Sequence, residues 1–123
     1  MNSEYSTPTP TEIKLHQKSR LMEISFANGK HFMLPYEFLR VYSPSAEVRG
    51  HGPGEEILQT GKQEVEITSL AAVGNYAVQP KFSDGHDTGI YSWEYLYELG
   101  ISQDERWKEY LGRVAAAAAK KDK

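Results

Sequence analysis

The stretch that most constrains the fold of this chain is residues 82–99, where a turn signal leads into an aromatic-rich segment. Asp84-Gly85 follows a strand-like run, and this dipeptide is typical of a tight hairpin turn because glycine readily adopts positive φ. Ser92 is placed to cap a short helix, since its hydroxyl can accept a hydrogen bond from an early helical amide. Gly100 is expected to end that helix in the left-handed conformation.

Apolar and polar residues alternate in five segments, which is the pattern of half-buried β-strands. These segments are 11–16, 20–26, 30–34, 64–68 and 75–82. Asn28-Gly29 is a second hairpin signal between two of them, so the first three strands predict a β-meander. The chain extends again from Thr88 to Tyr91 as a sixth strand. Pro80 indicates an edge or the end of its strand, because proline lacks the amide that a central ladder needs.

Helices are expected at three places: 36–42, 93–99 and 103–118. Pro35 suits the first turn of the first helix, where a missing amide costs nothing. Ser102 and Glu105 predict a capping box at the start of the last helix. An apolar stripe follows there at helical spacing: Trp107, Tyr110, Leu111 and Val114. The predicted fold class is α+β, a mostly antiparallel β-sheet of about six strands with two or three short helices, the longest at the C-terminus.

The composition changes at both ends of the chain, and these changes predict the domain organisation. Residues 1–10 are rich in serine, threonine and proline and predict a flexible arm. Residues 11–114 predict a single domain, large enough to bury a core without disulfides or metals. Residues 115–123 are rich in alanine and lysine, so the end of the last helix is expected to project into solvent.

The absence of cysteine excludes disulfides and thiolate metal sites, and it fits a reducing compartment. The chain shows no signal peptide and no run of the roughly 18 apolar residues that a membrane span needs. A net charge of −3 with dispersed basic residues argues against nucleic acid as a partner. These features predict a soluble cytoplasmic protein and leave its oligomeric state open.

His86 lies between Asp84 and Asp87, and this group is the strongest candidate for a site. Imidazole and carboxylate groups are ligands for zinc or iron, so one hypothesis is a metal site. The alternatives are that Asp84 only forms the turn while His86 hydrogen-bonds loop backbone, or that His86 contacts a partner. Adjacent residues rarely chelate one ion together, so further ligands would have to come from elsewhere in the chain.

The long irregular stretch 43–63 holds the other candidate histidine, His51, which lies among three glycines. A loop of this length within a compact domain is usually functional or mobile. Arg49 is a candidate anion contact, although the spacing of a phosphate loop or dinucleotide fingerprint is absent. The stretch is therefore either a recognition loop or a flexible connection. His51 could complete a metal site if the fold brings it near His86 and Asp84.

A longer pattern runs through this region. It consists of an aromatic residue, Asp-Gly-His, a hydroxyl residue, a second aromatic residue, tryptophan and leucine, in this order. Its residues here are Phe82, Asp84, Gly85, His86, Thr88, Ile90, Tyr91, Trp93 and Leu96. The pattern resembles the domain at the N-terminus of gamma-butyrobetaine hydroxylase, which also occurs alone in small bacterial DUF971 proteins of unassigned role. The resemblance extends from Pro8-Thr9 to Gly100 and so covers most of the chain.

The resemblance implies an accessory domain, because the oxygenase activity of the hydroxylase belongs to a separate double-stranded β-helix domain. It also implies a structural zinc held by three cysteines and one histidine. His86 matches that histidine, but the cysteine positions fall around Tyr42 to Val48, where this chain has none. The occurrence of the family's domain in iron–sulfur carrier ATPases further implies a role near metal-cofactor assembly.

The leading functional prediction is a small non-enzymatic accessory module that engages a protein partner through the 43–58 loop and the 84–93 corner. The expected contacts are Arg49, His51, Tyr91 and Trp93, since tyrosine and tryptophan are favoured at interfaces, although aromatic residues equally fit a core. The alternative is a zinc- or iron-binding domain whose ligands are His86, His51 and Asp84. Nucleophilic catalysis is disfavoured, because the chain has no cysteine and no Gly-x-Ser-x-Gly elbow.

Overall fold

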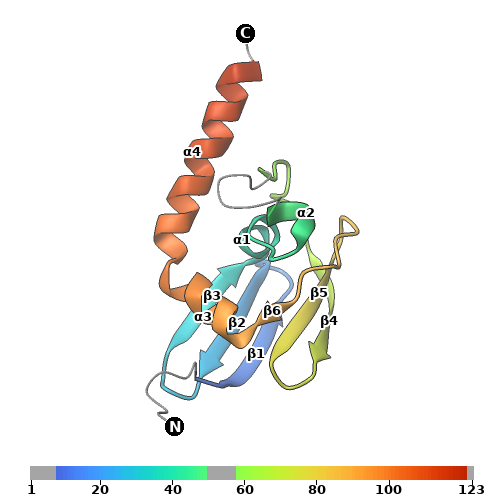
Figure 1. Cartoon of the computed structure of the whole chain (residues 1–123), viewed down its shortest axis with the longest axis vertical. Coiled ribbons are helices and arrows are strands. Elements are labelled where there is room, and N and C mark those ends of the chain that lie inside the picture. Colours follow the sequence, from blue (N-terminus) through green and yellow to red (C-terminus); the bar gives the residue numbers. More distant parts are fainter. Residues whose placement is uncertain (1–7, 50–57, 122–123) are drawn as a thin grey trace.

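The computed structural model describes residues 8–49 and 58–121, in which it places six strands and four helices (Figure 1). The strands form two antiparallel sheets of three strands each. The longest helix is the last one. The predicted α+β class is therefore confirmed, with the six strands divided between two sheets rather than joined in one.

The first sheet contains three strands in sequence order: β1 (Pro10–His16), β2 (Leu21–Phe26) and β3 (His31–Pro35). This is the predicted meander. Met22, Ile24 and Phe26 of the central strand are buried at alternate positions, because successive side chains of a strand point to opposite faces. The turn at Asn28-Gly29 is also confirmed. Gly29 has a φ of 90°, and the Asn28 side chain accepts a hydrogen bond of 3.0 Å from the Lys30 amide.

The second sheet also contains three strands in sequence order: β4 (Ile67–Val73), β5 (Ala77–Phe82) and β6 (Tyr91–Ser92). The strand predicted at 64–68 is displaced, since β4 begins at Ile67 and continues to Val73. The displacement follows from long-range pairing, because β4 is antiparallel to β5 along this whole length. Gly74, with a φ of 53°, begins the turn between the two strands.

The turn at Asp84-Gly85 is confirmed, but its return strand is shorter than predicted. Gly85 has a φ of 92°, and its amide donates a 3.0 Å hydrogen bond to the Phe82 carbonyl. Of the extended stretch from Thr88 to Tyr91, only Tyr91 belongs to β6, which pairs with the first two residues of β5. Pro80 was expected at an edge or a strand end, but it lies inside the central strand β5, opposite Leu70 of β4. It is beyond the two residues that pair with β6, so its missing amide leaves that short ladder intact.

The helices are α1 (Tyr36–Val41), α2 (Ala46–Arg49), α3 (Trp93–Ile101) and α4 (Gln103–Lys121). Pro35 is the residue that precedes α1, in agreement with the prediction. Ser92 caps α3, because its hydroxyl accepts a 3.1 Å hydrogen bond from the Tyr95 amide. The single turn α2 was not predicted from the sequence.

Two predictions about the junction of α3 and α4 are wrong. The helix α3 does not end at Gly100, where a Cβ would lie 2.4 Å from an atom of the Phe32 ring. The glycine therefore serves close packing of α3 on β3, and not a left-handed cap. In place of the predicted capping box, the Ser102 hydroxyl donates to the Glu98 carbonyl at 2.7 Å and accepts from Arg106 Nε at 2.6 Å.

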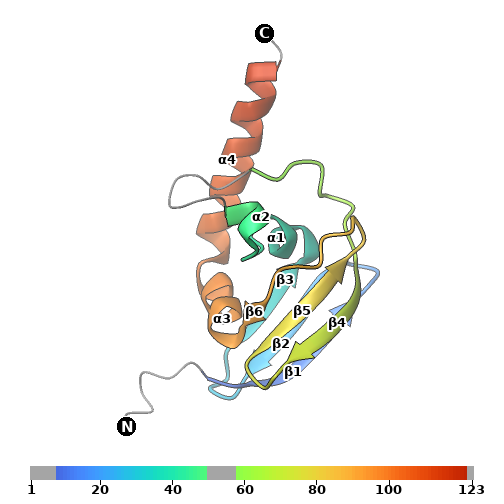
Figure 2. The same ribbon diagram turned by 45° about the vertical axis from the view of Figure 1, so that its right-hand side comes forward.

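The core lies where the two sheets meet α1 and α3 (Figure 2). Its fully buried large side chains come from both sheets and both helices: Met22, Ile24, Leu34, Tyr36, Phe38, Leu39, Ile67, Phe82, Tyr91, Leu96 and Leu99. Gln17 connects the sheets, because its amide donates to the Ile67 carbonyl at 3.1 Å while its oxygen accepts from the Tyr36 hydroxyl at 3.1 Å.

The first part of α4 packs on the body, and its C-terminal end extends away from the sheets (Figure 1). The Trp107 and Phe38 rings lie 6.1 Å apart, and the Tyr110 hydroxyl donates to Glu37 at 2.9 Å. Leu111, predicted on the same apolar stripe, is 49% exposed. None of the helices in the described ranges has the length and the apolar character that crossing a membrane requires.

Candidate functional site

Asp84 holds two cations in the corner that follows β5. Its Oδ2 atom lies 2.9 Å from Arg40 Nε and 2.6 Å from Lys62 Nζ. Its Oδ1 atom accepts a 3.2 Å hydrogen bond from the His86 amide, which stabilises the turn. Burial by itself would raise the pKa of Asp84, but the hydrogen bonds from Lys62 and the His86 amide and the charge of Arg40 lower it to about 2.

Arg40 was not predicted as part of this corner. The residue is only 7% exposed, as part of a helix whose other buried residues, Tyr36, Phe38, Leu39 and Val41, are apolar or aromatic. Its Nη1 atom has no hydrogen-bond partner among the described residues. A buried guanidinium with one unsatisfied donor costs free energy, which the ion pair with Asp84 offsets.

His86 is buried at 7% exposure, and its ring connects the corner to the segment between α1 and α2. The Nε2 atom lies 2.8 Å from Ser43 Oγ, which also accepts a 3.2 Å hydrogen bond from the Ser45 amide. A Cβ at Gly89 would lie 2.4 Å from the same Ser43 oxygen, so only glycine fits there. Imidazole, hydroxyl and glycine backbone therefore form one closely packed contact.

A second contact between the same two segments lies beside the first. The Ser45 and Thr88 hydroxyls are 2.7 Å apart. The segment 43–45 is thus joined to the segment 86–89 by side-chain hydrogen bonds, although no strand ladder connects them. The sequence does not determine whether these segments meet, and the structure brings them together.

The predicted metal ligands do not gather into a site in the part of the chain that is described. Both Asp84 oxygens accept hydrogen bonds from other groups, and the Nε2 atom of His86 contacts a serine hydroxyl. No three histidine, aspartate or glutamate side chains in the described ranges are placed to hold one ion. His51 lies outside the described residues. The described residues therefore do not fit the zinc that the family resemblance implies.

The predicted partner contacts have different positions. Tyr91 is fully buried, its hydroxyl donates to the Leu39 carbonyl at 2.5 Å, and burial raises its pKa. Its ring therefore belongs to the core and offers no surface to a partner. Trp93 is half-buried and donates from Nε1 to the Asn75 carbonyl at 2.8 Å, which attaches α3 to the turn before β5. Arg49 is the last residue of α2, but its side chain and all of His51 lie outside what is described.

Two adjoining hollows lie along α3, and together they form a feature that the sequence analysis missed. The first has a volume of about 310 Å³ and lies between the segment 41–48, α3 and α4. The second, of about 230 Å³, lies between Pro44, the end of the corner at Ile90 and the start of α3. Tyr95 and Glu98 line both hollows. We refer to the two hollows together as the α3 groove.

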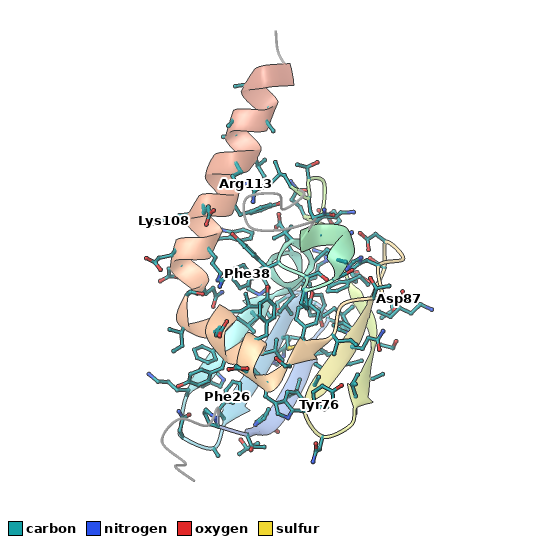
Figure 3. All side chains as sticks on the ribbon, viewed as in Figure 1. Phe26, Phe38, Tyr76, Asp87, Lys108 and Arg113 are labelled. Atoms are coloured by element: carbon teal, nitrogen blue, oxygen red, sulfur yellow. The ribbon has the colours of Figure 1, made fainter. Side chains whose placement is uncertain are left out.

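The first hollow of the α3 groove is lined by tyrosines whose hydroxyls are held by the protein. Tyr42 donates to the Arg106 carbonyl at 2.8 Å, and Tyr95 donates to the Tyr42 carbonyl at 2.5 Å. The Arg106 guanidinium lies 5.4 Å from the centre of the Tyr42 ring. Burial and the neighbouring Glu109 raise the pKa of Tyr42. In Figure 3, Arg113 lies on the side of α4 that faces this hollow.

A separate cluster that the sequence analysis missed lies on the first sheet. Both oxygens of Glu23 accept hydrogen bonds, one from His16 Nε2 at 2.7 Å and the other from His31 Nε2 at 2.6 Å. The hydrogen bond from His31, followed by that from His16, lowers the pKa of Glu23 to about 2. Diagonal neighbours on adjacent strands lie within reach of long side chains, so a predicted register would have revealed this cluster.

The comparisons with known proteins agree with the fold. Residues 13–97 match the family described as gamma-butyrobetaine hydroxylase-like, N-terminal. Two NMR solution structures are similar, one with 52% identity and a TM-score of 0.80 over 96% of this chain and 88% of the other, and one with 42% identity and 0.79 over 92% and 89%.

A crystal structure of a protein with unknown function from Acidithiobacillus ferrooxidans, described as a DUF971 family member, is 42% identical with a TM-score of 0.64. The similarity covers 75% of this chain and 92% of that protein. No curated protein matches the chain. The resemblance inferred from the motif is thus confirmed, and the chain belongs to the gamma-butyrobetaine hydroxylase-like, N-terminal family.

Proposed function

We propose that this chain is a non-enzymatic binding module that engages a protein partner along the α3 groove, between the 43–58 segment and the 84–93 corner. The observation that carries the proposal is the groove itself, whose two hollows share Tyr95 and Glu98 and border both segments. The predicted surface thus gains a third component, the exposed side of α3. The proposal moves the expected contacts away from the buried ring of Tyr91.

The side chains of the groove support a role in binding proteins. Tyrosine and arginine are over-represented among the residues that contribute most to protein–protein affinity. The hydroxyls of Tyr42 and Tyr95 are already bonded to backbone carbonyls, so little side-chain freedom remains to be lost on binding. Ile90 is 45% exposed at the rim of the groove and offers apolar area to an incoming chain.

The hydrogen bonds around His86 support a structural role for the corner rather than a catalytic one. His86 is bonded to Ser43, and Asp84 is neutralised by Arg40 and Lys62. General acid–base catalysis needs a group within reach of a substrate proton, whereas these groups are engaged with one another. Their arrangement fixes the relative position of the two segments that border the groove.

The test is site-specific photo-crosslinking in cells that express the chain from its own gene. A benzophenone amino acid at Ile90 should give one discrete crosslinked species, whereas the same group at Ala71, an exposed residue of β4, should not. The partner identified by the crosslink is then purified without the crosslink, and its affinity for the chain is measured by calorimetry. Ile90→Ser should weaken binding by roughly tenfold, because burial of an aliphatic side chain contributes on the order of 1.5 kcal/mol. Identical crosslinks from Ile90 and Ala71, or unchanged affinity of the Ile90 variant, would contradict the proposal.

A further inference from the structure

We propose that the occupant of the α3 groove is a short basic segment of the partner, in which an apolar side chain lies next to lysine or arginine. This inference rests on the proposed function and adds the chemistry of the partner. The apolar side chain would contact Pro44 and Ile90, while the cationic groups would pair with Glu94 and Glu98. The charges and the helix geometry around the second hollow carry the argument.

Glu94 and Glu98 lie one helical turn apart on α3, both exposed and both lining the second hollow. Like charges at this spacing repel each other and destabilise a helix. Neither carboxylate takes part in an ion pair within the described part of the chain. The second hollow is therefore lined by two negative charges of α3 and by no basic residue.

The position of Glu98 adds a second unfavourable term. Glu98 lies near the C-terminal end of α3, where the helix dipole favours cations, and the last turn of α3 has no basic residue. Sequences usually satisfy such local rules, and the exceptions concentrate at functional sites. A cation bound from outside would relieve both the repulsion with Glu94 and the mismatch with the dipole.

The remaining lining of the second hollow selects against a simple metal ion or a polyamine. Besides the glutamates, Pro44, the 45% exposed Ile90 and Tyr95 line this hollow and give it apolar surface. Apolar surface of this kind gains free energy only when an apolar group covers it. A peptide segment can combine an aliphatic or aromatic side chain with a neighbouring cation. Such an occupant would cover the apolar residues and pair with the glutamates at the same time.

The basic residues of the groove, Arg106 and Arg113, line the first hollow and not the second. Arg106 donates from Nε to the Ser102 hydroxyl and stacks on the Tyr42 ring, so its guanidinium is already engaged. The charge of the second hollow is thus negative and lies beside Ile90. Nucleic acid is disfavoured as an occupant, because its phosphates would meet the two glutamates.

The experiment uses random octapeptides displayed on phage, selected against the whole chain at low salt. Peptides that bind are synthesised, and their Kd is measured by fluorescence anisotropy against three variants. Glu94→Gln with Glu98→Gln removes the proposed charges. Asp104→Asn with Glu105→Gln removes two exposed charges of α4 outside the groove and is the matched control. Ile90→Ser removes the apolar contact.

We expect the selected peptides to carry lysine or arginine beside an apolar residue. The Glu94/Glu98 variant should raise their Kd about tenfold and reduce its dependence on salt, while the Asp104/Glu105 variant leaves both unchanged. Neutral or acidic peptides that need Ile90 but not the glutamates would overturn this inference and leave the proposed function standing. Peptides whose binding depends on neither Ile90 nor the glutamates would overturn both.

Discussion

Arg40 and Asp84 form the ion pair whose removal tests how the 84–89 segment is held to α1. Arg40 is 7% exposed and the Asp84 side chain 25% exposed, so both charges are largely withdrawn from water. Asp84→Asn keeps an oxygen for the His86 amide but leaves the guanidinium without a counter-charge. Removing one member of a fully buried pair costs roughly 3–5 kcal/mol, and the partial exposure of Asp84 reduces our expectation to about 2–3 kcal/mol.

Arg40→Met should cost less, about 1 kcal/mol, for two reasons that the structure supplies. Lys62 still pairs with Asp84 in that variant, at 2.6 Å in the parent structure. The substitution also removes Nη1, a buried donor without a partner among the described residues. The double variant Arg40→Met/Asp84→Asn removes the guanidinium together with its counter-charge, so no unpaired charge is left at position 40. It should therefore be more stable than Asp84→Asn alone, by about 1 kcal/mol.

The assay is urea denaturation at pH 7, followed by tryptophan fluorescence and far-ultraviolet circular dichroism, with the free energy of unfolding extrapolated to water. Glu12→Gln is the control, since Glu12 and Lys14 form an exposed pair at 3.6 Å that should contribute less than about 0.5 kcal/mol. Additive losses in the double variant would show that Arg40 and Asp84 are not coupled. A loss below about 1 kcal/mol in Asp84→Asn would refute the burial argument itself.

Two further predictions concern acid stability and glycine packing. Glu23 and Asp84 have pKa values lowered to about 2 in the folded state, so their contributions are present near neutral pH and are lost as the pH falls from about 4.5 towards 2. The urea concentration at the unfolding midpoint should fall over that pH range, and it should fall less in the Glu23→Gln variant. The same dependence on pH in this variant and in the parent protein would contradict the role of Glu23. Gly100→Ala should lower the melting temperature, because its Cβ would overlap the Phe32 ring, whereas Gly112→Ala meets open space and should add roughly 1 kcal/mol of stability. Equal effects of the two alanines would show that the close contact at Gly100 does not matter.

The sequence predicts best the features that depend on residues only a few positions apart. The Asn28-Gly29 turn, the cap at Ser92 and the alternation of β2 are all confirmed. Each rests on hydrogen bonds or side-chain directions within one element or one turn. The motif around Asp84 and His86 is also local, and it identified the family correctly.

The predictions fail where contacts between distant segments decide the outcome. Strand β4 is shifted towards the C-terminus because its register is set by β5 and not by its own alternation. The role of Gly100 depends on Phe32, which lies in a different strand. The pairing of Arg40 with Asp84 joins residues 44 positions apart, and no pattern around Arg40 distinguishes it from a surface arginine. The α3 groove is invisible in the sequence for the same reason, since several separate segments line it.

In this chain, which has no cysteine, the contact between Ser43 and His86 joins the two segments in which the family resemblance implies zinc ligands. The resemblance places zinc-binding cysteines around residues 42–48, and in this chain Ser43 of that segment lies 2.8 Å from His86. Residues 43–45 and 86–89 share no strand ladder and are joined by side-chain hydrogen bonds. One is the hydroxyl–imidazole contact of Ser43 with His86, packed against Gly89, and another joins the Ser45 and Thr88 hydroxyls. Ser43 lines the first hollow of the α3 groove and Pro44 the second, so this contact lies directly beside the surface to which we assign partner binding.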